Sequence, residues 1–226
     1  MEYKQKRNEV REIGEQVSGL VVAFDIEETL ISREGQQVTG VRPLATDLVD
    51  VIRDKNKLLL WSDIPQQRVN NLKAMPELEL LFRGAKGQTP VINREIWSNV
   101  YYAYSAVLEG AEMDERDVVL GKEIVDQIQT GAFEAALIEI RFKYLSVFQD
   151  WAPHRNGLKV PFMLGVDRLV DDVEKFDRNS QRYGYGGILK IGSFYKSKGS
   201  SQEYWKDEEM LRVAKELRVL SESKRG

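Results

Sequence analysis

The segment Leu20–Phe24 constrains the fold more than any other stretch of this chain. Its five apolar residues are rich in β-branched and aromatic side chains and contain no polar interruption, a pattern typical of a strand that is buried on both faces. Such strands occur in parallel sheets, whose two faces are covered by helices. Asp25 and Glu27 follow directly. Ligands of open α/β sheets bind beyond the carboxyl ends of the strands, so these two carboxylates stand where a site is expected.

The rest of the chain alternates between strand and helix patterns. Residues 32–37 have the composition of a polar turn, and Pro43 is expected at an early position of a helix, where its missing N–H has no partner to lose. We predict strands at 57–61, 168–170 and 187–191, a weaker strand at 78–82, and helices at 3–17, 41–54, 65–74 and 207–220. This alternation indicates an α/β fold with a mainly parallel sheet.

Between residues 93 and 151 the pattern changes. Three stripes of apolar residues at helical spacing follow one another there, with no strand signal. We therefore predict an all-helical insertion at 93–151 within an α/β core formed by residues 1–92 and 152–226.

Composition excludes several kinds of chemistry. The chain of 226 residues has no cysteine, which rules out thiol catalysis, disulfides and cysteine-bound metals. His154 is the only histidine, so a histidine-cluster metal site is excluded, and we interpret His154 as an exposed loop residue rather than a catalyst. The formal net charge of −3 supplies no general attraction for nucleic acid, although it does not exclude such a partner.

The amino-terminal segment is charged and lacks the apolar core of a signal peptide. No window approaches the roughly 18 apolar residues of a membrane span. We therefore expect a cytoplasmic protein with no membrane partner. The sequence predicts no oligomeric state.

Polar residues follow three of the predicted strands. Asp25 and Glu27 follow the first, Ser62 the second, and Asp171–Asp172 a later one, with Lys159 shortly before it. Four carboxylates that converge in a sheet crevice need a cation, and oxygen ligands favour Mg²⁺. We expect a magnesium site formed by Asp25, Glu27 and Asp171–Asp172. Ser62 and Lys159 would bind the oxygens of a phosphorylated substrate of unknown class.

The motifs resemble those of a known superfamily. The run Asp25-Ile26-Glu27-Glu28-Thr29-Leu30 is similar to the Asp-x-Asp-x-Thr signature of the haloacid dehalogenase-like hydrolases. It is most similar to the Asp-Leu-Asp-Glu-Thr-Leu form of the NLI-interacting-factor or small-CTD-phosphatase-like branch. The similarity covers about 18–90 and 155–220 and also includes Val41-Arg42-Pro43, Leu58–Ser62, Leu169–Asp172 and the start of the last helix.

This resemblance implies a three-layer Rossmann-like domain and a role for each motif. Asp25 would be the nucleophile that forms an aspartyl-phosphate, and Glu27 would protonate the leaving oxygen and then activate water. Ser62 and Lys159 would bind the phosphoryl group, with Thr29 also in the substrate site. Asp171–Asp172 would hold Mg²⁺. The helical insertion lies where caps occur in this superfamily, so we predict a cap or lid, with a dimerisation element as the alternative.

One position departs from the signature, because Glu27 replaces an aspartate. The extra methylene moves the carboxyl by about 1 Å or more, and such a misplacement can cost roughly 10²-fold in rate. A catalytically impaired binding or scaffolding protein is therefore the alternative to a phosphatase. A third hypothesis is phosphoryl removal from nucleic-acid ends or phosphoprotein, suggested by the branch resemblance and by the basic residues Arg155, Lys159, Lys196 and Lys198.

Each candidate residue also has an ordinary structural interpretation. Asp25 and Ser62 could cap the helices that follow them. Asp171–Asp172 could form a solvated turn, and Lys159 could be a surface lysine. The convergence of several motifs favours the phosphoryl-transfer hypothesis over these separate explanations.

Overall fold

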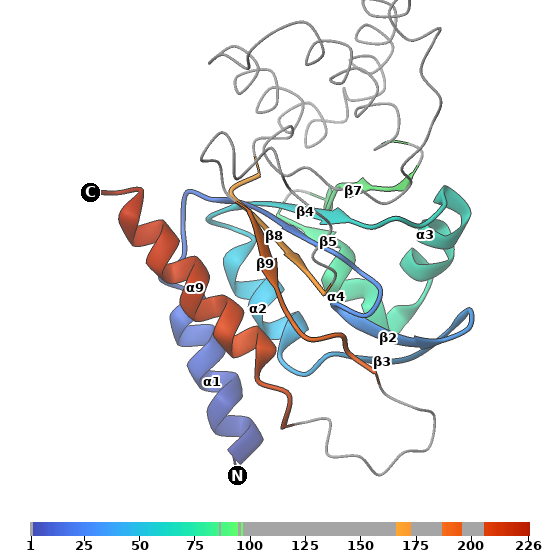
Figure 1. Cartoon of the computed structure of the whole chain (residues 1–226), viewed down its shortest axis with the longest axis horizontal. Coiled ribbons are helices and arrows are strands. Elements are labelled where there is room, and N and C mark those ends of the chain that lie inside the picture. The colour runs from blue at the N-terminus through green and yellow to red at the C-terminus, as the bar shows by residue number, and fades with distance from the viewer. Residues whose placement is uncertain (1, 86, 95, 97–165, 173–186, 196–205) are drawn as a thin grey trace, which may run out of the picture.

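The computed structural model describes residues 2–85, 87–94, 96, 166–172, 187–195 and 206–226 (Figure 1). Nearly all of the predicted insertion at 93–151 lies outside the described residues, as do Lys159 and His154. The proposed domain boundaries and the cap therefore stay predictions.

A five-stranded parallel sheet forms the centre of the fold. Its order is β7-β4-β1-β8-β9, with β1 in the middle, so the chain first builds outward on one side of β1 and then on the other. Such an order makes a Rossmann-like sheet with its switch point between β1 and β8, and it confirms the predicted α/β class. The strands are β1 (Val21–Phe24), β4 (Lys57–Trp61), β7 (Val91–Ile92), β8 (Arg168–Asp171) and β9 (Ile188–Lys190).

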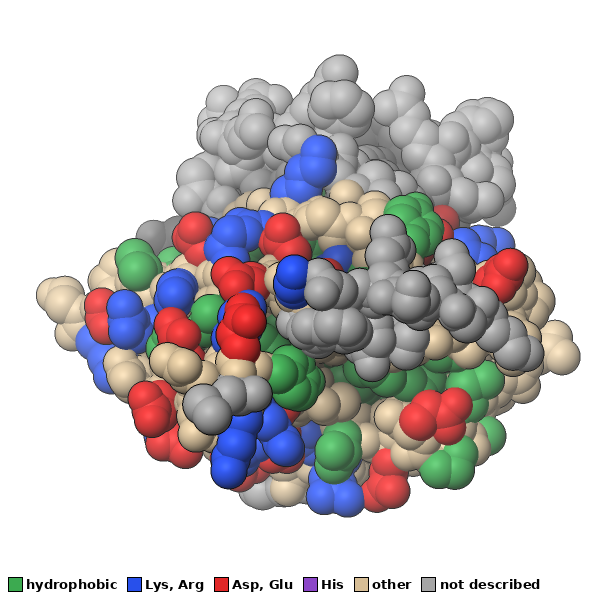
Figure 2. Space-filling view, turned by 90° about the horizontal axis from the view of Figure 1, so that it is seen from below, with side chains coloured by type: hydrophobic (Ala, Val, Ile, Leu, Met, Phe, Trp, Pro, Cys, Tyr) green, Lys and Arg blue, Asp and Glu red, His purple; other side chains and the backbone are tan. Residues whose placement is uncertain are grey.

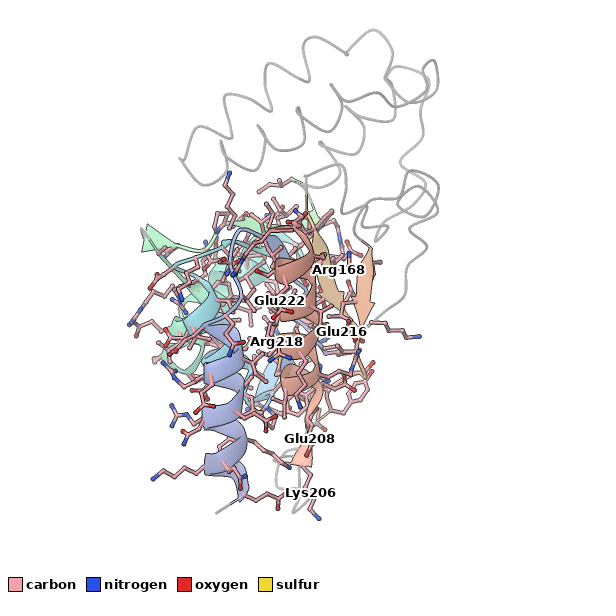
Figure 3. All side chains as sticks on the ribbon, turned by 90° about the vertical axis from the view of Figure 1, so that its left-hand side faces the viewer. Arg168, Lys206, Glu208, Glu216, Arg218 and Glu222 are labelled. Carbon is pink, nitrogen blue, oxygen red and sulfur yellow. The ribbon has the colours of Figure 1, made fainter. Side chains whose placement is uncertain are left out.

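Helices flank this sheet (Figures 1 and 3). Helix α1 contacts both α2 and α9, and α2 also contacts α4. Figure 3 shows α1 and α9 side by side, with Glu216, Arg218 and Glu222 along α9. The helices are α1 (Glu2–Gly14), α2 (Ala45–Ile52), α3 (Gln66–Lys73), α4 (Glu79–Phe82) and α9 (Glu209–Ser223), with a 3₁₀ turn at Pro76–Leu78.

The central strands are buried on both faces. Val22 and Phe24 of β1 pack in one hydrophobic core with residues of α1, α2 and α9. Ala23 of β1 and Leu59 of β4 point to the opposite face, because side chains alternate along a strand, and they are also buried. This double burial confirms the interpretation of the apolar run 20–24.

Two antiparallel hairpins accompany the sheet. They are β2–β3 (Ile31–Glu34 and Gln37–Val41) and β5–β6 (Arg83–Gly84 and Gly87–Gln88). The polar turn predicted over 32–37 is confirmed only in its middle, at Gly35 and Gln36, where Gly35 has a φ of 58°; the residues on either side belong to the strands β2 and β3. The sequence did not reveal the two strands of this hairpin, because they are only partly buried. Ser32 is buried, whereas Glu34 and Gln37 are exposed.

Two further predictions need correction. The strand predicted at 78–82 is helical instead, since Pro76 opens a 3₁₀ turn and Leu78, Leu81 and Phe82 are buried at helical spacing. Pro43 lies before α2 rather than inside it. The residue between them, Leu44, is left-handed at φ of 65°, so the helix begins only at Ala45.

The described surface mixes charges of both signs. Figure 2 shows acidic and basic side chains interspersed on one face of the molecule. Among the described residues, no helix has the length and apolar character needed to cross a lipid bilayer.

Candidate functional site

Three aspartates meet at the switch point of the sheet. Asp25 follows β1, Asp171 ends β8 and Asp172 comes next. One carboxylate oxygen from each lies within 4.8 Å of the others, and the three residues are only 6%, 3% and 8% exposed. The backbone N–H of Asp25 donates to the carbonyl of Val170 at 2.9 Å, which continues the pairing of the two strands. The structure therefore brings these three predicted site residues together.

Two hydroxyl groups orient Asp172. The Thr29 hydroxyl donates to Oδ1 of Asp172 at 3.1 Å and accepts from its backbone N–H at 3.0 Å. The Ser193 hydroxyl donates to Oδ2 at 2.7 Å. Thr29 is fully buried, and both of these hydrogen bonds of its hydroxyl are to Asp172. Its role in substrate binding stays a prediction. Sequence reasoning missed Ser193, although a serine shortly after a predicted strand was the signal that singled out Ser62.

A buried arginine holds the loop that carries Ser193. Arg42 donates to the carbonyl of Gly192, its Nε lies 3.1 Å from Oδ2 of Asp207, and its guanidinium carbon lies 5.2 Å from the Phe194 ring centroid. Burial lowers the pKa of the Arg42 guanidinium, and the nearby carboxylates, Asp207 foremost, oppose that shift. The cation thus links the loop after β9 to the start of α9.

The backbone after β1 is held in an unusual conformation. Glu28 is left-handed, with φ of 64°, a region that non-glycine residues adopt at some cost. Its carbonyl accepts from the N–H of Phe194 at 2.6 Å, and its carboxylate accepts from the Tyr195 hydroxyl at 2.8 Å. The hydrogen bond from the Tyr195 hydroxyl to the Glu28 carboxylate raises the pKa of Tyr195. The loops after β1 and β9 therefore fix one another beside the aspartates.

Glu27 does not join the three-aspartate group that the described residues form. Its Oε1 lies 3.0 Å from Nε of Arg68, and its Oε2 lies 3.0 Å from Nε of Arg33. The structure thus directs this carboxylate to two guanidinium groups. The catalytic and metal-binding roles that the signature implies for Glu27 stay predictions.

Ser62 lies at the same edge of the sheet as Asp25. Ser62 follows β4, the neighbour of β1. Because Phe24 pairs with Leu60, the strands β1 and β4 end at nearly the same level of the sheet. The residue is buried, and its backbone N–H donates to the carbonyl of Ile92 at 3.0 Å. Lys159, the other predicted phosphate-binding residue, lies outside the described residues.

The donor set of the three-aspartate group suits a hard divalent cation. Three buried carboxylates at this separation repel one another, and a cation offsets that repulsion. All the donors are carboxylate oxygens, the type that Mg²⁺ prefers. The residues present therefore fit the metal that the resemblance implies.

No protein-family model, curated protein or solved structure matches this chain. The assignment of the fold therefore depends on the strand order and the flanking helices. The superfamily assignment rests on the sequence motifs and is a proposal.

Proposed function

We propose that the protein is a Mg²⁺-dependent phosphohydrolase of the haloacid dehalogenase-like superfamily that cleaves a phosphomonoester. The observation that carries this proposal is the meeting of three buried aspartates at the switch point between β1 and β8, with Asp25 directly after the central strand. Ligands of such sheets bind in the crevice at this point.

In the proposed reaction the Asp25 carboxylate attacks phosphorus and the bond from phosphorus to the alcohol oxygen breaks. The departing oxygen takes up a proton, either from Glu27, as the resemblance implies, or from water. Water then attacks the aspartyl-phosphate, which releases inorganic phosphate and restores Asp25. Asp171 and Asp172 would hold Mg²⁺, which when bound offsets the negative charge of the phosphoryl group. Ser62 would donate to a phosphoryl oxygen, and Lys159 keeps the same role by resemblance.

Phosphate release from an aryl phosphate tests this proposal. We expect turnover by the wild type with Mg²⁺, none after chelation, and a loss of roughly 10³-fold or more in Asp25→Asn, since a missing nucleophile has effects of at least this size. Asp63→Asn is the matched control, because Asp63 follows Ser62 but pairs with Arg94 at 3.0 Å. Equal turnover by the wild type and Asp25→Asn would exclude Asp25 as the nucleophile.

The second candidate function is binding without turnover on the same fold. The observation in its favour is that Glu27, the expected proton donor, pairs with two guanidinium groups. Both of its carboxylate oxygens therefore already have cationic partners. This alternative predicts that the wild type binds Mg²⁺ with a phosphate mimic such as vanadate yet releases no phosphate from aryl or alkyl esters. Turnover that disappears in Asp25→Asn would contradict it.

A further inference from the structure

We propose that Glu27 is a positioning residue, whose carboxylate anchors the β2–β3 hairpin through Arg33 and Arg68, and that it is not the proton donor. The anchoring stands on geometry alone, and its catalytic consequence rests on the proposed function.

Arg68 connects three parts of the fold. It comes from α3, its Nε donates to Oε1 of Glu27 at 3.0 Å, and its Nη1 donates to the carbonyl of Gln36 at 2.5 Å. Gln36 lies in the turn of the hairpin. The side chains of Arg68 and Glu27 are only 7% and 12% exposed, so water competes little for this pair. One buried guanidinium thus binds the hairpin turn, the loop after β1 and α3 together.

Arg33 completes the anchor from within the hairpin. It lies on β2, and its Nε is 3.0 Å from Oε2 of Glu27. A backbone bridge between Glu27 and Ile31 attaches the base of the hairpin to the same loop. Each carboxylate oxygen of Glu27 therefore has its own guanidinium partner.

This arrangement gives a physical reason for glutamate at a position where the signature has aspartate. One more carbon–carbon bond extends the side chain by about 1.5 Å, which lets the carboxylate reach arginines on β2 and α3. If Glu27 donated a proton to a leaving oxygen, that proton would have to come from a carboxylate that already pairs with two guanidinium groups. The longer side chain suits the anchoring role and works against the acid–base role.

The leaving group distinguishes the two roles. An aryl oxygen departs without a proton, whereas an alkyl oxygen needs one. A general acid contributes roughly 10²–10⁴-fold, so if Glu27 were the acid, Glu27→Gln would lose that factor on alkyl phosphate and little on aryl phosphate. If Glu27 is an anchor, Glu27→Gln and Arg68→Met lower both rates by a similar factor, and the aryl-to-alkyl ratio stays within about twofold of the wild type.

Amide hydrogen exchange of residues 31–41 gives a readout that needs no turnover. We expect exchange there to quicken roughly tenfold or more in Glu27→Gln and Arg68→Met, because each removes a charge-assisted contact that holds the hairpin. Arg33→Met is a milder variant, since that side chain is 35% exposed. Glu79→Gln is the matched control, because it makes the same change in the exposed ion pair with Arg83.

Every outcome decides the proposal. Faster exchange with an unchanged aryl-to-alkyl ratio supports it, and a loss confined to alkyl phosphate overturns it. Unchanged exchange in Glu27→Gln also overturns it. If the wild type turns over no ester, the proposed function fails, and the exchange measurement alone then decides whether Glu27 anchors the hairpin.

Discussion

Asp172 receives a hydroxyl donor on each carboxylate oxygen, from Thr29 on one side and Ser193 on the other. Such contacts fix the direction of a ligating carboxylate, and their loss typically weakens metal binding 10–100-fold. Thr29 also accepts from the backbone N–H of Asp172, so one buried hydroxyl serves two atoms of that residue. This residue pair joins the loop after β1 to the end of β8.

Replacement of Thr29 by valine should therefore affect both stability and metal binding. The change keeps the shape but leaves the N–H and one oxygen of Asp172 without this partner, which should cost about 1–3 kcal/mol in the free energy of unfolding. Mg²⁺ affinity should fall roughly 10–100-fold. Denaturant unfolding and calorimetric titration measure the two effects, with Ser223→Ala, an exposed serine bonded to Leu220, as the control. Wild-type Mg²⁺ affinity in Thr29→Val would contradict this account of Asp172.

At the scale of elements, Asn56 joins the segment between α1 and β1 to the end of α2. Its Oδ1 accepts from the N–H of Leu20 at 3.0 Å, and its Nδ2 donates to the carbonyls of Val17 at 3.1 Å and Ile52 at 2.7 Å. These bonds satisfy backbone groups at the entry to the central strand and at the end of α2. One side chain thus ties the segment that enters β1 to the end of α2.

Asn56→Ala should lower the free energy of unfolding by about 2–3 kcal/mol, because it leaves several partly buried backbone groups without this partner. The midpoint of urea unfolding measures the change. Gln16→Ala is the control, since its amide donates to the Glu12 carbonyl in an exposed position, and we expect a change within about 0.5 kcal/mol. A similar midpoint shift in the two variants would show that Asn56 has no special role.

The sequence predicted β4, whose side chains are almost all buried, and the amphipathic helices α3 and α9, whose buried residues recur at helical spacing. The run 57–61 is strand β4 with the predicted bounds, because continuous apolar residues match a strand covered on both faces. The β2–β3 hairpin was missed because its polar residues resemble a loop. The helical turn at 78–82 was misassigned because a short apolar run fits a strand as well as a helix.

The same limits explain which site residues were foreseen. Asp25 and Asp171–Asp172 could be placed together because parallel strands all end at one edge of the sheet. The arginine partners of Glu27 could not, because Arg33 belongs to the missed hairpin and Arg68 approaches from α3. Pairing across elements depends on their arrangement in space, and local sequence patterns do not carry that information.

At the scale of the whole molecule, the strand order concentrates negative charge at one point of the sheet. Placing β8 beside β1 brings together aspartates that lie far apart in the sequence, and all three are buried. Repulsion between these carboxylates lowers the stability of the folded state. A cation that binds only the folded protein should therefore stabilise it globally.

Mg²⁺ should raise the melting temperature of the wild type. A ligand at 100 times its dissociation constant adds about 2.7 kcal/mol to the free energy of unfolding, and Asp172→Asn should lose most of this gain because one donor becomes neutral. Calorimetry with and without Mg²⁺ measures the shift, with NaCl at the same ionic strength as the control. An equal shift in Asp172→Asn, or an equal effect of NaCl, would contradict a specific site.

Fluorine NMR of beryllofluoride binding tests the central claim, that Asp25 accepts a phosphoryl group beside a bound cation. We predict a bound signal for the wild type only with Mg²⁺, its loss in Asp25→Asn, and its retention in Asp63→Asn and Glu27→Gln. A bound signal that persists in Asp25→Asn, or that forms equally well without Mg²⁺, would contradict the account.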